Sequence, residues 1–335
     1  MATEHLLTLK AAAEQYAVTY DRLRRAAWDG RLPTEGTGHA RLVRPEHVEI
    51  FLREGRVVPG REPHAHQRTA APLGKVIAVA LLKGGTGKTT STLNLGVALA
   101  ERGYRVLLLD TDHQCSLTSA AGLNPAELAP EQTLFGAIQT WTGQRRATLH
   151  EVIQSSPAGV DIVPASIRLS LTERALHLQS RREYVLQQIL APVAAQYDVV
   201  LIDTQPASSN LVHNALVAAH QVIIPVEPEQ LAVESLGLML DQIAEVRESG
   251  LNPQLTLGGV LITQVDVRMT LHRDLVSEIR EQFGADLLVF DTVIRRSSKI
   301  AESQARHQSV LQYDPKGIGA TSYRALAEEI SRAWE

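Results

Sequence analysis

The chain of 335 residues has one cysteine, Cys115, and aromatic side chains make up only 4% of it. One cysteine cannot form an internal disulfide, and this is typical of proteins from a reducing compartment. With so few aromatic side chains, the core must be aliphatic, and a hydrophobic content of 44% is ample for one. The length exceeds that of one average domain and favours two, one of them large.

Long apolar runs are also missing, and none approaches the ~20 residues that a membrane-spanning helix needs. The N-terminal stretch MATEHLLTLK lacks the basic, apolar and small-residue order of a signal peptide. We therefore expect a cytoplasmic protein. Residues 1–75 hold 12 Lys and Arg against 9 Asp and Glu, whereas the remainder holds 21 against 28. Any nucleic-acid-binding function must therefore lie in local patches.

A glycine-rich stretch lies between the apolar run Val76–Leu82 and the helical pattern Ser91–Glu101. Its residues are Lys83, Gly84, Gly85, Thr86, Gly87, Lys88, Thr89 and Thr90. Such a turn lets backbone N–H groups close around a phosphate chain, and the following helix adds positive potential. Lys88 is placed to reach the β- and γ-phosphates, and the Thr89 hydroxyl to hold Mg²⁺. Leu82 stands where the usual pattern has its first glycine, and Lys83 makes this a deviant P-loop.

Strands and helices alternate beyond this loop, which predicts an α/β fold with a mostly parallel, doubly wound sheet. The predicted strands are Tyr104–Leu109, Val160–Pro164, Val199–Asp203, Gln221–Val226, Gln254–Gln264 and Leu287–Ile294. The helices between them include Glu183–Gln196 and Leu231–Glu248. In such sheets ligands bind at the carboxyl ends of the strands.

Aspartates stand at these strand ends. Asp203 is placed to bind Mg²⁺ through water, and Asp112 to orient or polarise an attacking water. Asp110 either supports the metal shell or caps a helix. We interpret Cys115, which follows closely, as a small packing residue.

The first 54 residues form a different pattern. A short helix after the Thr8 cap, a tight turn and a basic helix, Tyr20–Trp28, precede a hairpin around Gly36–Gly38 and a helix at Pro45–Arg53. LTLKAAAEQYAV, TYDRLRRAAWDGRLP and ARLVRPEHV resemble the winged helix-turn-helix domains of the excisionase and MerR type. In that geometry the second helix enters the major groove, and the candidate DNA contacts are Thr19, Tyr20, Arg22, Arg24 and Arg25. The alternative is a small oligomerisation or cargo domain whose arginines form a solvated face.

Residues 55–74 are rich in proline, glycine and charge, without hydrophobic periodicity, and this indicates a linker. His64 and His66 lie there without a further ligand nearby, which favours a solvated stretch over a metal site. We expect a DNA-binding domain at 1–54, the linker at 55–74 and a nucleotide-binding domain at 75–335.

KGGTGKTT, LLLDTDHQ, VDIVPASIRLS, YDVVLIDTQP, IIPVEPEQLAVESL and VLQYDPKGIGATSYRALAEE together resemble the ParA-type DNA-partition ATPases, from about Lys75 to the C-terminus. The resemblance implies a slow ATPase that uses ATP, ADP and Mg²⁺ and forms a homodimer on ATP. It also implies non-specific DNA binding on the nucleoid, and stimulation by a centromere-binding, ParB-type partner.

The resemblance also assigns roles to residues. Lys83 reaches the phosphates of the partner subunit, Lys88 and Thr89 bind phosphate and metal, Asp112 serves hydrolysis, and Asp203 is the Walker B residue. Matching positions for non-specific DNA binding are Arg268, Arg296 and Lys299, with Arg273 and Arg280 on the intervening helix; ordinary surface charges are the alternative.

The chain departs from the family pattern at four positions. His113 and Gln205 replace prolines that border the metal and water site. Arg295 and Ser297 replace Pro and Asn near the nucleotide base, so base contacts there would use backbone groups.

Three other kinds of protein share this loop, and this chain lacks the feature that marks each of them. Nitrogenase-type iron proteins need two cysteines per subunit, membrane-positioning relatives carry a basic apolar C-terminal helix, and tyrosine kinases of this lineage end in a tyrosine cluster. With its N-terminal domain, such a partition ATPase would also repress its own operon. Two alternatives stay open: a nucleotide-sensing repressor with vestigial hydrolysis, and a positioner of a protein cargo over the nucleoid.

Overall fold

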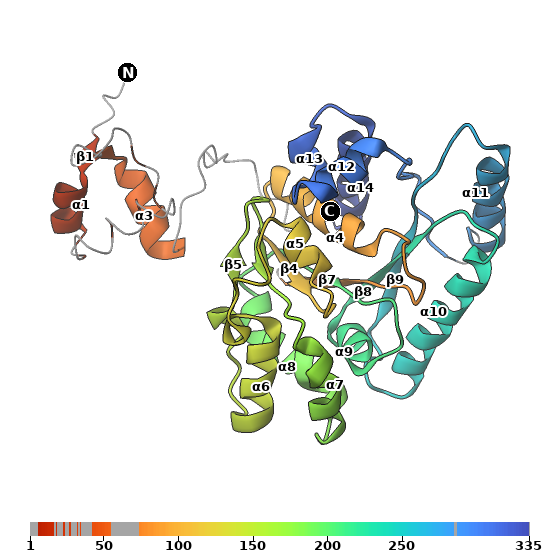
Figure 1. Cartoon of the computed structure of the whole chain (residues 1–335), viewed down its shortest axis with the longest axis horizontal. Coiled ribbons are helices and arrows are strands. Elements are labelled where there is room, and N and C mark those ends of the chain that lie inside the picture. Colours follow the sequence, from red (N-terminus) through yellow and green to blue (C-terminus); the bar gives the residue numbers. More distant parts are fainter. Residues whose placement is uncertain are drawn as a thin grey trace. The chain divides into compact units, whose positions relative to one another are not determined.

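The computed structural model describes residues 6–16, 18, 23, 27, 32, 34, 42–54, 74–284 and 287–334, with the backbone alone at 50, 53 and 54. The chain divides into two compact units, Met1–Arg68 and Thr69–Glu335, so that the division falls inside the predicted linker. Figure 1 follows the elements of both units along the chain.

In the described part of the N-terminal unit, β1 (Leu7–Thr8) pairs antiparallel with β2 (Leu42–Val43). Helix α1 (Leu9–Gln15) follows β1, and α3 (Pro45–Glu54) follows β2. The Thr8 hydroxyl accepts a hydrogen bond from Ala11 N at 3.1 Å, which confirms the predicted cap. A small core joins these elements and is formed by Leu9, Ala12, Ala13, Leu23, Ala27, Leu32, Val43, Val48 and Phe51.

The predicted basic helix, Tyr20–Trp28, is described only at Leu23 and Ala27, which are helical and buried. Its candidate DNA contacts lie outside the described residues, and so does the predicted hairpin around Gly36–Gly38. These contacts are Thr19, Tyr20, Arg22, Arg24 and Arg25. The winged helix-turn-helix therefore stays a prediction.

Within 74–284 and 287–334, seven strands form one sheet in the order β5-β6-β4-β7-β3-β8-β9. They are β3 (Lys75–Val79), β4 (Val106–Asp110), β5 (Gln154–Ser155), β6 (Asp161–Val163), β7 (Val199–Asp203), β8 (Gln221–Val226) and β9 (Thr256–Ile262). Only β5 pairs antiparallel with its neighbour among these strands. The predicted mostly parallel α/β sheet is confirmed.

Helices cover both faces of this sheet (Figure 1). Because side chains alternate along a strand, Val76 and Ala78 belong to one buried cluster and Ile77 to the other. The helices are α4 (Lys88–Glu101), α5 (Ser116–Ala120), α6 (Leu134–Gln144), α7 (Leu169–His177), α8 (Val185–Ala194), α9 (Asn210–Ala218), α10 (Ala232–Glu248), α11 (Thr270–Phe283), α12 (Ser298–Ala305), α13 (Val310–Tyr313) and α14 (Ile318–Arg332). Helices α6, α8, α9 and α10 contribute to the first cluster, and α4 and α14 to the second.

The predicted strand Leu287–Ile294 is wrong. This segment makes only isolated bridges, Val260 with Val289 and Val265 with Arg295. The physical reason is a competing acceptor, since the backbone N–H groups of Asp291 and Thr292 donate to the carboxylate of Glu329 at 2.6 and 3.0 Å. Phe290 N bonds Val260 O of β9, so Thr292 N is the next donor that a continuous ladder would need, and Glu329 accepts it instead.

Across the described ranges of the chain, no helix combines the length and the apolar character that crossing a bilayer requires.

Candidate nucleotide site

The phosphate loop connects β3 to α4 and leaves the N-terminus of α4 without a side-chain cap. Gly85 and Gly87 have φ of 79° and 84°, which residues with a Cβ rarely adopt. Thr86 Oγ1 is buried and finds no hydrogen-bond partner in the described part of the chain. A buried hydroxyl without a partner is unfavourable, so a phosphate oxygen would fit this loop.

Lys88 places a cation inside the loop. Its side chain is buried, and Nζ donates to the carbonyl oxygen of Lys83 at 2.7 Å. Burial lowers the pKa of Lys88, and the negative charges of Asp203 and Asp112 oppose that change. The lysine and both predicted aspartates therefore act on one another at one end of the sheet.

Asp203, at the end of β7, is fully buried and lies against α4. Thr89 Oγ1 donates to its Oδ2 at 2.7 Å, and Thr92 Oγ1 lies 3.4 Å from its Oδ1. Burial raises the pKa of Asp203 well above its usual range, and the charge of Asp110 adds to this. A nearby cation would relieve that cost.

The donors around Thr89 suit Mg²⁺, which prefers one or two protein oxygens completed by water and phosphate. No group of three or more His, Cys, Asp and Glu suited to a metal ion occurs in 74–284, 287–334 or the described N-terminal residues. The metal would therefore be held by Thr89 and Asp203 only together with the nucleotide.

Asp112 lies in a tight turn after β4 and is 7% exposed. Its Oδ1 accepts from Gln114 N, and its carbonyl oxygen accepts from Cys115 N, both at 2.9 Å. Cys115 is a buried free thiol, and burial raises its pKa to about 12, which fits a packing residue better than a reactive one.

Asp110 uses its carboxylate inside the fold. Oδ2 accepts from Thr118 N at 2.8 Å and Thr118 Oγ1 at 2.6 Å, and Oδ1 accepts from Asp112 N. Burial raises the pKa of Asp110 to about 6. Because Thr118 lies in the first turn of α5, these contacts favour the capping interpretation over a metal ligand.

Lys83 forms an ion pair with Glu229 of the same chain, in the loop after β8. Neighbouring Glu227 accepts from Gln264 Nε2 at 2.9 Å and from Arg296 Nη2 at 3.1 Å. Gln264 Nε2 also donates to Gly85 O at 2.6 Å. Sequence reasoning missed these contacts, although Glu227 directly follows the predicted strand Gln221–Val226 and Gln264 is the last residue of the predicted strand Gln254–Gln264.

Other loop residues have contacts that the sequence did not indicate. Gly84 lies beside Pro206, whose nearest atom would be 3.8 Å from an added Cβ. Thr263 Oγ1 donates to Thr86 O at 2.8 Å, and Gln304 Nε2 donates to Thr90 Oγ1 at 2.5 Å. Arg295 is exposed and bridges Val265 through the backbone.

The candidate DNA-binding cations of this unit are paired with acidic side chains. Arg268 bonds Asp266 twice, at 2.9 and 2.7 Å, Lys299 bonds Glu302 at 2.7 Å, and Arg296 bonds Glu227. The Arg268 guanidinium holds the pKa of Asp266 below its usual range. Arg273 donates to Thr270 Oγ1, whereas Arg280 donates to the carbonyl oxygens of Phe290 and Asp291 and so supports the fold.

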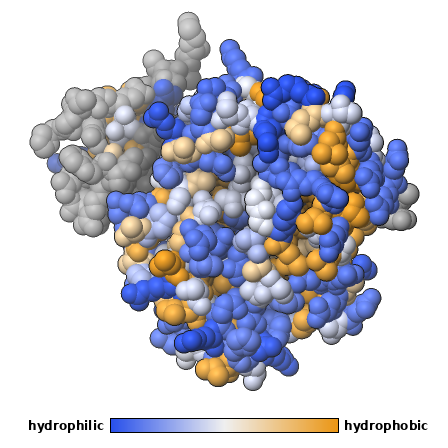
Figure 2. Space-filling model, turned by 45° about the vertical axis from the view of Figure 1, so that its right-hand side comes forward, coloured by the Kyte–Doolittle hydropathy of each residue, from blue (hydrophilic) through white to orange (hydrophobic). Residues whose placement is uncertain are grey.

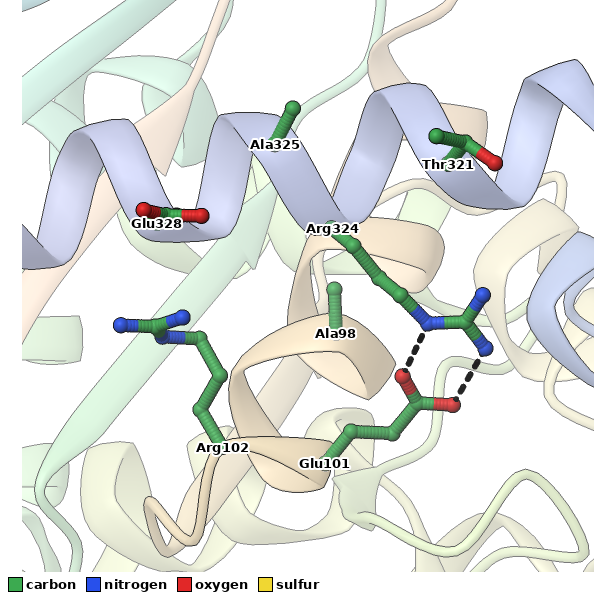
Figure 3. Close-up of a pocket in the computed structure, with 7 residues that line it drawn as sticks. All are labelled: Ala98, Glu101, Arg102, Thr321, Arg324, Ala325 and Glu328. Carbon is green, nitrogen blue, oxygen red and sulfur yellow. Dashed lines mark hydrogen bonds and ion pairs between the residues drawn. The ribbon is translucent and has the colours of Figure 1, made fainter.

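A pocket of about 430 Å³ lies between the C-terminal end of α4 and α14 (Figure 3). Its charged groups partly satisfy one another, since Arg324 bonds Glu101 at 2.6 and 3.0 Å. The phosphate loop is at the other end of α4, roughly 20 Å away at 1.5 Å per helical residue. The pocket is therefore separate from the nucleotide site.

Comparison with known proteins identifies several relatives. Residues 74–257 match a family model for an AAA domain. The chromosome-partitioning ATPase Soj of Treponema pallidum is 37% identical over 259 residues, which cover 77% of this chain and 97% of that protein. The chromosome partitioning protein ParA of Caulobacter vibrioides is 36% identical over 275 residues, covering 78% and 95%. A cobyrinic acid a,c-diamide synthase structure from Mycobacterium smegmatis, with bound ATP analog and magnesium, is 33% identical with a TM-score of 0.66, covering 78% and 96%.

Proposed function

This chain belongs to the family of Soj- and ParA-type P-loop ATPases, and we propose that its ATP hydrolysis drives the partition of DNA. The main support for this proposal is that Lys88, Thr89, Asp203 and Asp112 lie close together at the phosphate loop. The similarity to Soj and ParA supports DNA as the cargo.

In the proposed cycle, Lys88 binds the β- and γ-phosphates of ATP, and Thr89 and Asp203 hold Mg²⁺. The metal ion, when bound, neutralises charge that develops on the phosphates. Asp112 orients the attacking water and accepts its proton. The hydrogen bond from Gln114 N to Asp112 Oδ1 leaves Oδ2 for that role.

We further propose that ATP brings two copies together and that Lys83 then reaches the partner's phosphates. Lys83 must first leave Glu229, and both side chains are partly exposed, which makes this exchange inexpensive. Leu231 and Leu238, beside Glu229 and on α10, are 58% and 51% exposed. Figure 2 brings the side with α10 and α11 forward and shows hydrophobic patches among hydrophilic residues, which suits a surface that a second copy covers.

The proposed DNA surface consists of Arg268, Arg296 and Lys299 in each subunit. DNA phosphates would replace the carboxylates that hold these cations in the free chain. A centromere-binding, ParB-type partner would stimulate hydrolysis and release the DNA. The N-terminal unit would add sequence-selective contact with an operator through Arg22, Arg24 and Arg25.

The test is binding of the full chain to random-sequence DNA with ATP, with ADP and without nucleotide, at several salt concentrations. We expect tight binding only with ATP, with a log–log salt slope of up to about −5, because a dimer offers about six phosphate contacts at ~0.9 per contact. Arg268→Ala should weaken binding and flatten the slope. The control Arg146→Ala removes an arginine that is likewise paired with an acidic side chain, Glu151, and it should change neither.

The alternative of a nucleotide-sensing repressor draws on the separate core of the N-terminal unit. It predicts selective binding to one DNA sequence that does not require ATP and that is as strong or stronger with ADP. A positioner of a protein cargo would instead give the same ATP-dependent binding to random DNA and differ only in the partner that stimulates hydrolysis.

A further inference from the structure

The loops that follow β4 and β7 are joined by the side chains of His113 and Gln205. His113 Nδ1 lies 3.1 Å from Gln205 Oε1. The two strands are parallel neighbours with Asp110 opposite Asp203, so each loop starts from an aspartate of the site. At the two positions where the resemblance places rigid prolines, this chain therefore has residues that contact each other.

Gln205 is anchored on its other side. Its Nε2 donates to Ser209 Oγ at 2.5 Å, and Ser209 Oγ accepts from Val212 N as the N-cap of α9. The amide therefore presents its oxygen to His113, and Nδ1 of a neutral imidazole must carry the proton. Gln205 is 7% exposed and the His113 side chain 36% exposed, so the contact is shielded from water on the glutamine side.

The same imidazole nitrogen faces the carboxylate of Asp112, with 3.6 Å between His113 Nδ1 and Asp112 Oδ1. That oxygen also accepts from Gln114 N. The Asp112 turn is thus held by its own backbone on one side and, through His113, by the β7 loop on the other. Before Asp112, the turn is also fixed by Thr111, whose N and Oγ1 donate to Asp203 O at 3.1 and 2.6 Å. The His113 contact is therefore the link to the β7 loop on the side of the turn that follows Asp112.

We propose that His113 is a positioning residue for ATP hydrolysis: through Gln205 it holds the turn that carries Asp112 at a fixed place relative to Asp203. This inference rests on the proposed role of Asp112. The pair does not include the phosphate loop, so its loss lowers kcat and leaves KM for ATP nearly unchanged. Removing a partly shielded hydrogen bond that orients a reacting group should lower kcat about tenfold.

The experiment measures kcat and KM of the full chain for His113→Leu, Gln205→Met and the double variant. Each single change should lower kcat about tenfold, and the double variant should be no slower than the singles, since both remove one interaction. The proposal would be overturned if the decrease in kcat of the double variant equalled the product of the two single decreases. It would also be overturned if kcat stayed unchanged and the loss of activity came from a higher KM.

Two further variants separate positioning from packing. His113→Asn keeps an N–H donor close to the place of Nδ1 and should restore most of kcat; activity as low as that of His113→Leu would overturn the hydrogen bond as the cause. His150→Leu replaces an exposed histidine beside Glu151 and should leave kcat unchanged. Histidine ¹⁵N spectra should show a proton on Nδ1 of His113 that Gln205→Met redistributes, and an unchanged spectrum would contradict the contact.

Asp112→Asn distinguishes the two levels of the argument. Full hydrolysis in Asp112→Asn would refute the proposed role of Asp112, and the positioning role with it. An inactive Asp112→Asn combined with independent effects of His113→Leu and Gln205→Met would refute only the positioning role.

Discussion

Replacing Glu229 by glutamine tests whether Lys83 is held back by its own chain. The ion pair keeps Lys83 over its own subunit, and the hydrogen bond from Lys83, together with its positive charge, lowers the pKa of Glu229. Glutamine keeps the size of the side chain and removes its charge. If Lys83 serves the partner's phosphates, Glu229→Gln should strengthen dimerisation with ATP.

The magnitude follows from the exposure of the pair. The Lys83 and Glu229 side chains are 28% and 49% exposed, and ion pairs of this kind contribute about 0.2–1 kcal/mol. A symmetric dimer breaks two of them, so the gain is about 0.4–2 kcal/mol, or roughly 2- to 30-fold in the dimer dissociation constant.

Sedimentation equilibrium with ATP, in an Asp112→Asn background that prevents hydrolysis, measures this constant. The gain should shrink between about 0.05 and 0.5 M salt, because salt screens exposed pairs. Glu248→Gln removes the same charge from an exposed position at the end of α10 and serves as the control. An unchanged or weaker dimer in Glu229→Gln would refute the reasoning.

Three more predictions concern the core and the nucleotide site of this unit. Gly96→Ala places Cβ 2.7 Å from a side-chain atom of buried Leu108, so chemical denaturation should show that the unfolding free energy falls by roughly 1–2 kcal/mol. For Gly237→Ala, whose Cβ would have no atom within 4 Å, the unfolding free energy should rise by up to about 1 kcal/mol. Asp110 binds its proton more tightly in the folded chain than in the unfolded chain. The difference in unfolding free energy between the wild type and Asp110→Asn should therefore fall by on the order of 2 kcal/mol as the pH rises from about 4 through 6. A difference that stays constant with pH would contradict this. Thr89→Ala should raise the Mg²⁺ concentration needed for half-maximal ATP hydrolysis at least about tenfold, whereas Thr89→Ser should stay near wild type, and magnesium titrations would measure both.

Short stretches of the sequence were enough to predict much of the fold. Apolar runs that end in aspartate predicted β4 and β7 correctly, because a buried parallel strand is apolar on both faces. Thr8 predicted its helix start because a cap depends on residues three positions away. The phosphate loop was evident from its glycines and lysines, since its conformation depends on local backbone freedom.

The wrong strand at Leu287–Ile294 shows where local pattern ends. Its apolar run suits a strand, but Glu329, 37 residues from Thr292, accepts the backbone N–H group of Thr292 that further pairing with β9 would need. A sequence shows that such a carboxylate exists, and it does not show which donors the carboxylate will meet.

The contacts around the nucleotide site also join residues that are far apart in the sequence. Glu229 is 146 residues from Lys83, Gln264 is 179 residues from Gly85, and Gln205 is 92 residues from His113. The sequence by itself determined most strands of the sheet, the phosphate loop and the aspartates at the strand ends, because these depend on near neighbours and on runs of apolar residues. Only the tertiary structure decided which charges pair and which loops are joined, because those energies depend on distances that folding alone creates.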